Sequence, residues 1–171
     1  MFNEESLELI TIDLLKEQGY SYESGESIGR DYSEVILEYN LTCALFKINK
    51  RLNENIISKY LHTGVSVPEY TKEGVRYHTV KLIDFENIEN NEFLVSNQFT
   101  IIEHSEKRPD VIIFINGLPL IVFELKSMTR EEVNLESAYN QLKGYMNVHI
   151  PSLFYYNQIL VISDGARAKA G

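Results

Sequence analysis

Three residues have the clearest chemical potential in this chain, and they lie in the stretches Arg108-Pro109-Asp110 and Glu124-Leu125-Lys126. Two carboxylates that converge, here Asp110 and Glu124, form a hard, oxygen-rich site suited to a magnesium ion. A lysine beside them can orient a water molecule and stabilise charge on a phosphate. An acid-x-Lys triplet alone is a weak signal, but the chain contains no other Glu-x-Lys, Asp-x-Lys or Pro-Asp. The sequence therefore indicates a metal-dependent phosphate chemistry at this place.

A β-hairpin is expected to bring these residues together. Residues 111–115 and 120–126 are apolar runs typical of strands, and Asn116-Gly117 between them is a strong hairpin signal. Side chains on a strand alternate with a period of two, so a plain two-residue turn would place Asp110 on the face opposite to Glu124. We therefore predict an odd-length loop or a β-bulge, which pairs Asp110 with Glu124 instead.

Other polar residues could support such a site. Gln141 and Tyr145 lie four apart on a predicted helix over 135–148 and share a face, from which they could contact a phosphate or a base, or simply form a surface pair. Glu8, on the predicted first helix, could complete a metal site or face solvent. The histidines show no metal-ligand spacing, and no glycine-rich phosphate loop suggests nucleotide binding.

The remaining periodicity predicts an α/β fold around a mixed central β-sheet flanked by helices. Helices are expected over 6–16, with Leu7, Ile10, Leu14 and Leu15 on one face and a stop near Gly19, over 33–47, and over 53–62 between a cap at Asn53 and Gly64. Residues 65–74 are expected to form a loop. Strands are expected over 76–85, 93–103, the hairpin, and, after a helix capped by Asn134, over 156–163 with both faces buried.

Length and composition fit a single soluble domain over residues 1–171, with a helical part at about 1–64 and a sheet-forming core at about 75–165. No apolar run approaches the roughly 20 residues that span a bilayer, and the acidic start does not resemble a secretory signal. The lone Cys43, which excludes an internal disulfide, is expected in the core. These features suit a cytoplasmic protein that does not bind a membrane.

The charge balance argues mildly against a protein that grips nucleic acid by itself. The formal net charge is −9, whereas such proteins usually carry a basic excess. Two explanations keep a DNA-cutting function open: other domains or subunits hold the DNA, or the acids cluster at a metal site.

Longer motifs resemble one known family over nearly the whole chain, the N-terminal nuclease domain of the R (restriction) subunit of type I restriction enzymes. The matching stretches are Leu7-Glu8, Leu14-Leu15, Gly19-Tyr20, residues 82–85 with Asn91 and Phe93, Asn97-Gln98-Phe99, residues 108–120, 124–126, 138–142, 150–154 and 163–165. The resemblance implies the PD-(D/E)xK nuclease fold, in which a mixed sheet flanked by helices carries an acid, acid and lysine triad.

The resemblance also implies residue roles. Asp110 and Glu124 would bind magnesium with the help of the backbone carbonyl of Leu125, and Lys126 would position the attacking water. Gln141 and Tyr145 match the Gln-x-x-x-Tyr motif of the RecB-related branch of these nucleases. Glu8 matches the acid of the family's first helix.

By the same resemblance the chain is expected to be an endonuclease, a type I site-specific deoxyribonuclease. Its substrate would be double-stranded DNA, its cofactor Mg²⁺, and its partners the methylation and specificity subunits. The family's R subunit continues into an ATP-driven motor that translocates DNA, and no such motor is present in these 171 residues. We therefore expect a fragment of a longer R subunit, with ATP needed only by the full-length subunit.

Two other functions stay open from the sequence. One is a non-catalytic docking module that keeps the nuclease fold, against which the intact triad argues. The other is a PD-(D/E)xK nuclease that acts on branched or damaged DNA, against which the order of the further motifs argues.

Overall fold

A mixed six-stranded sheet forms the centre of the protein, whose computed structural model describes residues 3–50, 52, 54–63, 67–126 and 134–171. The strand order is β1-β4-β7-β8-β9-β10. These strands are β1 (Ser21–Tyr22), β4 (Phe93–Asn97), β7 (Val111–Ile115), β8 (Leu118–Leu125), β9 (Ile159–Ser163) and β10 (Ala168–Ala170). The predicted meander β4-β7-β8 is antiparallel, while β1 pairs with β4, and β9 with β8, in parallel. The predicted α/β fold class is confirmed.

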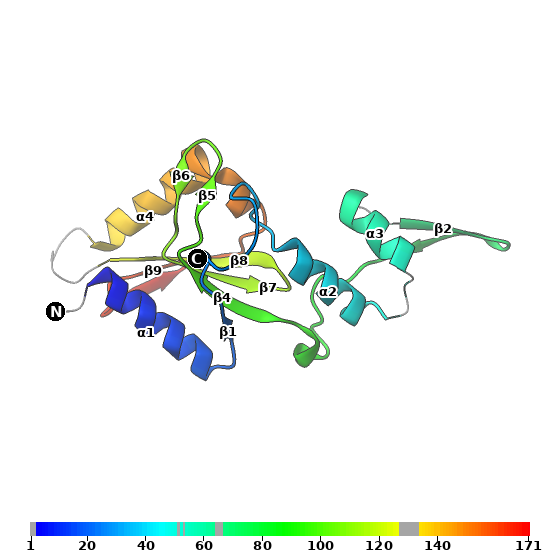
Figure 1. The fold of residues 1–171 in the computed structure, drawn as a ribbon, viewed down its shortest axis with the longest axis horizontal. Helices are drawn as coiled ribbons and strands as arrows, with labels where there is room; N and C mark the ends of the chain where they lie inside the picture. Colours follow the sequence, from blue (N-terminus) through cyan, green and yellow to red (C-terminus); the bar gives the residue numbers. More distant parts are fainter. Residues whose placement is uncertain (1–2, 51, 53, 64–66, 127–133) are drawn as a thin grey trace.

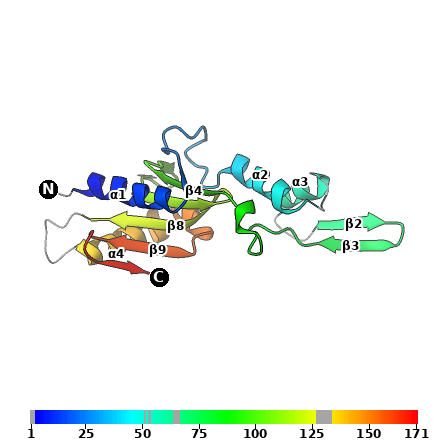
Figure 2. The same ribbon diagram turned by 90° about the horizontal axis from the view of Figure 1, so that it is seen from below.

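Helices cover the sheet on both faces (Figures 1 and 2). On one face lies α1 (Glu4–Glu17), and on the other lies α4 (Asn134–Gly144), which continues through the π-helical turn η2 (Tyr145–His149) to the 3-10 turn η3 (Pro151–Tyr155). Alternation along β7 serves both layers, because Val111 packs with Leu7 of α1 and Ile112 packs with Leu142 of α4. None of the helices in the described residues is long and apolar enough to cross a membrane.

The remaining elements lie to one side of the sheet. Figure 2 shows α2, α3 and a two-stranded hairpin extending away from α1 and α4. Their bounds are α2 (Glu38–Ile48), α3 (Glu54–Thr63), β2 (Val67–Thr71), β3 (Gly74–His78) and the 3-10 turn η1 (Ile88–Asn90), while the short pair β5 (Ile101–Ile102) and β6 (Glu106–Lys107) lies near η2. The predicted loop over 65–74 is therefore wrong in its described part. Pro68 is tolerated in β2 because the sheet has only two strands, so every strand is an edge.

The turn of the β7–β8 hairpin contains two residues with left-handed backbone, Asn116 (φ 53°) and Gly117 (φ 78°). This is the conformation that two-residue hairpin turns require. Gly117 also meets the start of α2, where it accepts a hydrogen bond from the N–H of Leu37 at 2.9 Å. A Cβ at this position would collide with the Leu37 carbonyl oxygen, so the close approach requires glycine.

A β-bulge follows the turn and sets the register of the hairpin. The pairing shifts midway along β7 and leaves Leu120 of β8 as an extra residue. Beyond the bulge Val111 lies opposite Phe123, so Asp110, one step further, lies across from Glu124. The predicted bulge is confirmed, and the two carboxylates face the same side of the sheet.

Several predicted boundaries are wrong because side chains use the backbone groups that a longer element needs. The helix expected over 33–47 begins only at Glu38, since Asp31 accepts the N–H and hydroxyl of Ser33, and Arg30 donates to the carbonyls of Asp31 and Glu34. The strand expected over 93–103 breaks at Gln98, which has a φ of 54°.

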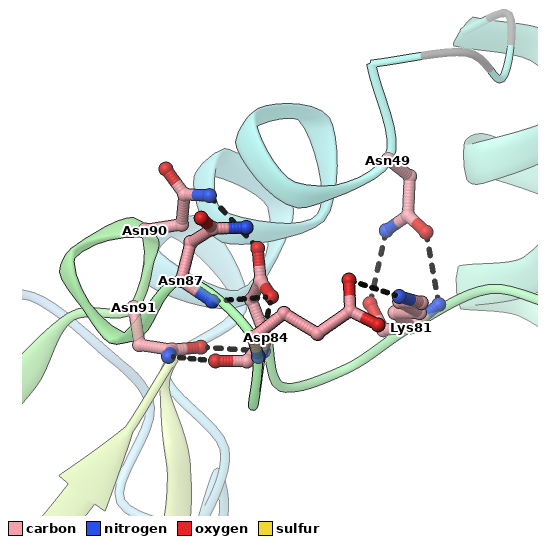
Figure 3. Close-up of polar contacts among 7 residues, drawn as sticks. Asn49, Lys81, Asp84, Asn87, Asn90 and Asn91 are labelled. Carbon is pink, nitrogen blue, oxygen red and sulfur yellow. Dashed lines mark hydrogen bonds and ion pairs between the residues drawn. The ribbon is translucent and has the colours of Figure 1, made fainter.

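The strand expected over 76–85 ends at His78, because a polar network holds the connection that follows (Figure 3). The network comprises Asn49, Lys81, Asp84, Asn87, Asn90 and Asn91. Asp84 accepts the backbone N–H of Asn87 and the side-chain amide of Asn90, and Asn91 bonds both backbone groups of Asp84. This loop is thereby fixed without strand pairing.

Burial corrects three further expectations. On α1 the buried residues are Leu7, Glu8 and Ile12, while Ile10 and Leu14 are exposed. Cys43 is exposed, because α2 buries Leu41, Ala44 and Leu45 instead. The last long strand begins at Ile159 and is only partly buried, since the apolar cluster under α1 draws on β4, β7 and β8. The proposed caps Asn53 and Gly64, and the side chain of Asn134, lie outside what the structure describes.

Candidate active site

The hairpin brings Asp110, Glu124 and Lys126 together at one end of the sheet. Asp110 Oδ2 accepts the backbone N–H of Leu125 at 2.6 Å, and Lys126 Nζ donates to Glu124 Oε1 at 2.6 Å. The Glu124 side chain is 0% exposed and that of Lys126 is 15% exposed. The three residues that the sequence singled out thus form one half-enclosed cluster.

Burial sets the electrostatics of this cluster. It raises the pKa of Asp110 to about 6, and burial together with the charge of Asp110 raises the pKa of Glu124 to about 8. Burial lowers the pKa of Lys126, but the hydrogen bond and charge of Glu124 outweigh it and raise that pKa on balance. Both carboxyl groups therefore resist ionisation here, and a nearby cation would favour their charged forms.

The oxygen atoms of the cluster fit a divalent cation. Glu124 Oε2 is buried and has no hydrogen-bond partner among the described residues. Because the N–H and C=O of one strand residue point to the same side, the carbonyl of Leu125 faces the side on which its N–H meets Asp110. Within the described ranges no group of three or more His, Cys, Asp or Glu side chains could hold a metal, so an ion here would need the carbonyl or water besides the two carboxylates.

The predicted Gln-x-x-x-Tyr pair reaches the cluster from the α4 side. Gln141 Nε2 donates to Tyr145 Oη at 2.6 Å, and Tyr145 is 6% exposed. Burial first, and the charge of Glu124 second, raise the pKa of Tyr145 to about 12, so the hydroxyl keeps its proton near the carboxylates. The π-helical turn begins at Tyr145, whose carbonyl accepts the N–H of Ile150, and such turns are frequent at functional sites.

Glu8 lies on α1, which covers the face of the sheet opposite to α4. Its Oε2 accepts hydrogen bonds from Asn97 Nδ2 and Gln98 Nε2, each at 3.2 Å. The charge of Glu8 contributes to the raised pKa of Asp110, and its partner Asn97 lies opposite Val111, the residue after Asp110. Of the two alternatives for Glu8, a solvated surface acid is excluded, because the residue is buried.

Sequence reasoning missed three residues around the cluster. The charge of Glu4 acts on Asp110, Glu124 and Lys126 alike. Its spacing of one helical turn before Glu8 was the available signal. The prediction of one long strand over 93–103 gave no reason to place Asn97 and Gln98 near the site, although both lie in a stretch that resembles the family.

Comparison with known proteins places the chain in a family. The family model described as the N terminus of the type I restriction enzyme R protein matches residues 1–171 of the sequence. The HindI endonuclease subunit of a type I restriction enzyme from Haemophilus influenzae is 36% identical over 204 residues, covering 100% of this chain and 19% of the relative. The putative type I restriction enzyme MjaIXP endonuclease subunit of Methanocaldococcus jannaschii is 35% identical over 197 residues, covering 96% of this chain and 19% of that relative.

These curated relatives are much longer than the chain, which spans about a fifth of their length. The match nevertheless extends along all of the chain and includes both stretches that form the cluster, the one with Asp110 and the one with Glu124 and Lys126. The chain belongs to the family defined by the N terminus of the type I restriction enzyme R protein.

Proposed function

We propose that this chain is the magnesium-dependent endonuclease domain of a type I restriction–modification system, which hydrolyses phosphodiester bonds of double-stranded DNA. The observation that carries the proposal is the fully buried Glu124, with one oxygen lacking a described partner, beside Asp110 and Lys126. Relatives that match the whole chain are named endonuclease subunits of type I restriction enzymes, which supports the biological setting.

Asp110, Glu124 and the carbonyl of Leu125 are the groups that would hold the magnesium ion. When bound, magnesium supplies the positive charge that polarises the scissile phosphate and lowers the pKa of a bound water. The fit rests on the chemistry of the donors, because magnesium prefers oxygen ligands and keeps several waters. It also rests on the raised pKa values of both carboxyl groups, which indicate a place where positive charge is favoured.

The other residues of the cluster have roles that follow from their positions. Lys126 is held by Glu124, so its ammonium group can orient the attacking water and stabilise charge that develops on the phosphate. Tyr145 keeps its hydroxyl proton and is oriented by Gln141, so it can donate a hydrogen bond to a phosphate oxygen. Glu8 adds negative charge on the side of α1.

The wider activity belongs to a larger assembly in this proposal. Translocation of DNA by an ATP-driven motor, and partnership with methylation and specificity subunits in the cytoplasm, are proposed for the full-length enzyme. Only that motor would use ATP. The net charge of −9 fits a domain to which DNA is delivered by other parts of the enzyme.

The test uses a full-length R subunit carrying this domain, assembled with its partner subunits and supplied with ATP, Mg²⁺ and a plasmid that contains a recognition site. We expect Asp110→Ala and Lys126→Ala each to lower cutting at least about a hundredfold, while ATP hydrolysis continues. Matched controls are Asp13→Ala and Lys16→Ala, which remove an exposed ion pair of α1 and should cut normally. Cutting at the wild-type rate by both site variants would refute the triad.

The alternatives predict other outcomes of related measurements. A non-catalytic docking module would bind no Mn²⁺ at millimolar concentration with Asp110 and Glu124 in place. A nuclease for other DNA structures would cut branched or damaged DNA in preference to intact duplexes.

A further inference from the structure

The surroundings of Glu8 carry an inference that rests on the proposed function and deepens it. We infer that Asn97 and Gln98 are positioning residues of this site, whose two amides hold the carboxylate of Glu8 at the end of the sheet where Asn97 lies opposite Val111, the residue after Asp110. Neither residue is adjacent to the triad in sequence, and they act through Glu8 alone.

The contacts converge on one atom. Asn97 Nδ2 and Gln98 Nε2 both donate to Glu8 Oε2, each at 3.2 Å. Glu8 and Asn97 are 9% and 7% exposed, so water competes little for these hydrogen bonds. Two donors to one carboxylate oxygen fix its position better than one, because charge-assisted hydrogen bonds are strong and directional.

The backbone at Gln98 makes this convergence possible. Neighbouring residues of a regular strand point to opposite faces, so both amides could not reach the same oxygen if β4 continued. Gln98 instead has a φ of 54°, in the left-handed region that residues other than glycine seldom occupy. Such conformations are unfavourable, persist only where the surrounding structure holds them, and cluster at functional sites.

Gly25 holds this bend in place. Its N–H donates to the carbonyl of Asn97 at 2.8 Å, and a Cβ there would collide with the backbone of Phe99 and lie 2.7 Å from the carbonyl oxygen of Gln98. Phe99 itself is fully buried, with its ring centroid 5.1 Å from that of Phe114. The bend is thus clamped between the chain that follows β1 and the core.

Tyr22 orients the amide of Asn97. Its hydroxyl donates to Asn97 Oδ1 at 2.9 Å, which leaves Nδ2 as the atom that faces Glu8. The order of contacts is therefore Tyr22, Asn97 and Glu8, with Gln98 as a second donor to the same carboxylate. All three contacts lie on the α1 side, opposite to Gln141 and Tyr145.

Metal affinity provides a readout separate from cutting. Partners that orient groups around a metal typically change its affinity by about tenfold or more when they are removed. We expect Gln98→Gly, which removes the whole side chain together with its amide but suits the left-handed backbone, to weaken Mn²⁺ binding by this chain about tenfold in calorimetric titration. Tyr22→Phe should weaken it about threefold, and Tyr39→Phe, which alters a tyrosine 80% exposed, is the matched control.

A double-mutant cycle separates positioning from a general loosening of the structure. In a Glu8→Gln background, Gln98→Gly and Tyr22→Phe should change the Mn²⁺ dissociation constant less than twofold. Equal weakening in both backgrounds, or no weakening in the wild-type background, would overturn the inference. Thermal unfolding of each variant verifies that it is folded at the temperature of titration.

The titration of Asp110→Ala distinguishes this inference from the proposed function. Loss of Mn²⁺ binding in Asp110→Ala with unchanged binding in Gln98→Gly overturns only the positioning role. Wild-type affinity in Asp110→Ala overturns the proposed metal site and the positioning role with it.

Discussion

Glu124 is fully buried, and Asp110 across from it is partly buried. Their folded-state pKa values of about 8 and about 6 lie above the values near 4 of an unfolded chain. A carboxyl group whose pKa rises on folding destabilises the folded state at every pH where the unfolded chain is already ionised. The site therefore trades stability for a cluster that favours a cation.

Asp110→Asn tests this trade at the level of one residue. Without metal, at pH 8, the variant should be more stable than wild type by on the order of 1–2 kcal/mol, because it removes the cost of ionising a buried carboxyl. The difference should shrink as the pH falls through about 6, where folded Asp110 takes up its proton, and should vanish near pH 4. Urea unfolding in the presence of a chelator measures it.

The exposed Asp13 gives the matched control, since Asp13→Asn should change stability little at either pH. A wild type more stable than Asp110→Asn at pH 8 without metal would contradict the electrostatic account.

Residue types and spacing were sufficient to predict Asp110, Glu124 and Lys126 as a group, because one hairpin unites them. They were not sufficient for Asn97 and Gln98, which depend on a bend in β4 and a contact with α1 far away in sequence. The buried face of the first helix was also predicted incorrectly, since the acid Glu8 occupies a buried position where an apolar residue is expected.

At the scale of elements, the β7–β8 hairpin determines whether the carboxylates meet. Its turn and bulge act together, because the turn alone would place Asp110 and Glu124 on opposite faces. The turn is also held by the start of α2, where the N–H of Leu37 donates a hydrogen bond to the carbonyl of Gly117. The network of Figure 3 adds a second anchor, because Asn91 accepts a hydrogen bond from the side chain of Asn116.

Gly117→Ala and Gly19→Ala form a matched pair of variants that tests the contact between the turn and the start of α2. Both glycines have positive φ, 78° and 94°, but a Cβ at Gly19 meets nothing within 4 Å, whereas at Gly117 it would lie 2.8 Å from Leu41 N and even closer to the Leu37 carbonyl. We expect Gly19→Ala to cost about 1 kcal/mol of unfolding free energy and Gly117→Ala to cost at least about 3 kcal/mol. Equal losses in urea unfolding would show that α2 does not clamp the turn.

The elements that sequence patterns missed are short or locally controlled. Strands β1 and β10 have two and three residues, too few to show a period. The β2–β3 hairpin was missed because Pro68 and polar residues weaken its pattern. Hydrogen bonds that Asp31 accepts and Arg30 donates delay the start of α2, and hydrophobic periodicity does not reveal such contacts.

At the scale of the whole molecule, the site lies at the end of β8, a strand that contacts both α1 and α4, the two helices that cover opposite faces of the sheet (Figures 1 and 2). Elements α2, α3 and the β2–β3 hairpin extend away from that junction. The chain as a whole carries a net charge of −9, so its overall charge repels a phosphate backbone at long distances.

This charge predicts weak binding of DNA by the chain alone. At 0.15 M salt and without divalent metal, we expect a dissociation constant above about 10⁻⁵ M for a 20-base-pair duplex, which is in the range of non-specific binding. Fluorescence anisotropy with labelled DNA measures it. Submicromolar affinity would contradict the view that other parts of the enzyme deliver the DNA.

The central claim is that Asp110, Glu124 and the Leu125 carbonyl share one metal ion. The most direct measurement is a crystal structure of the chain soaked with Mn²⁺, whose anomalous scattering identifies the ion. The account predicts one peak bonded to both carboxylates and the carbonyl, with Lys126 adjacent to its water ligands. Density without an ion at these groups at millimolar Mn²⁺, or an ion bound elsewhere with Asp110 and Glu124 empty, would contradict it.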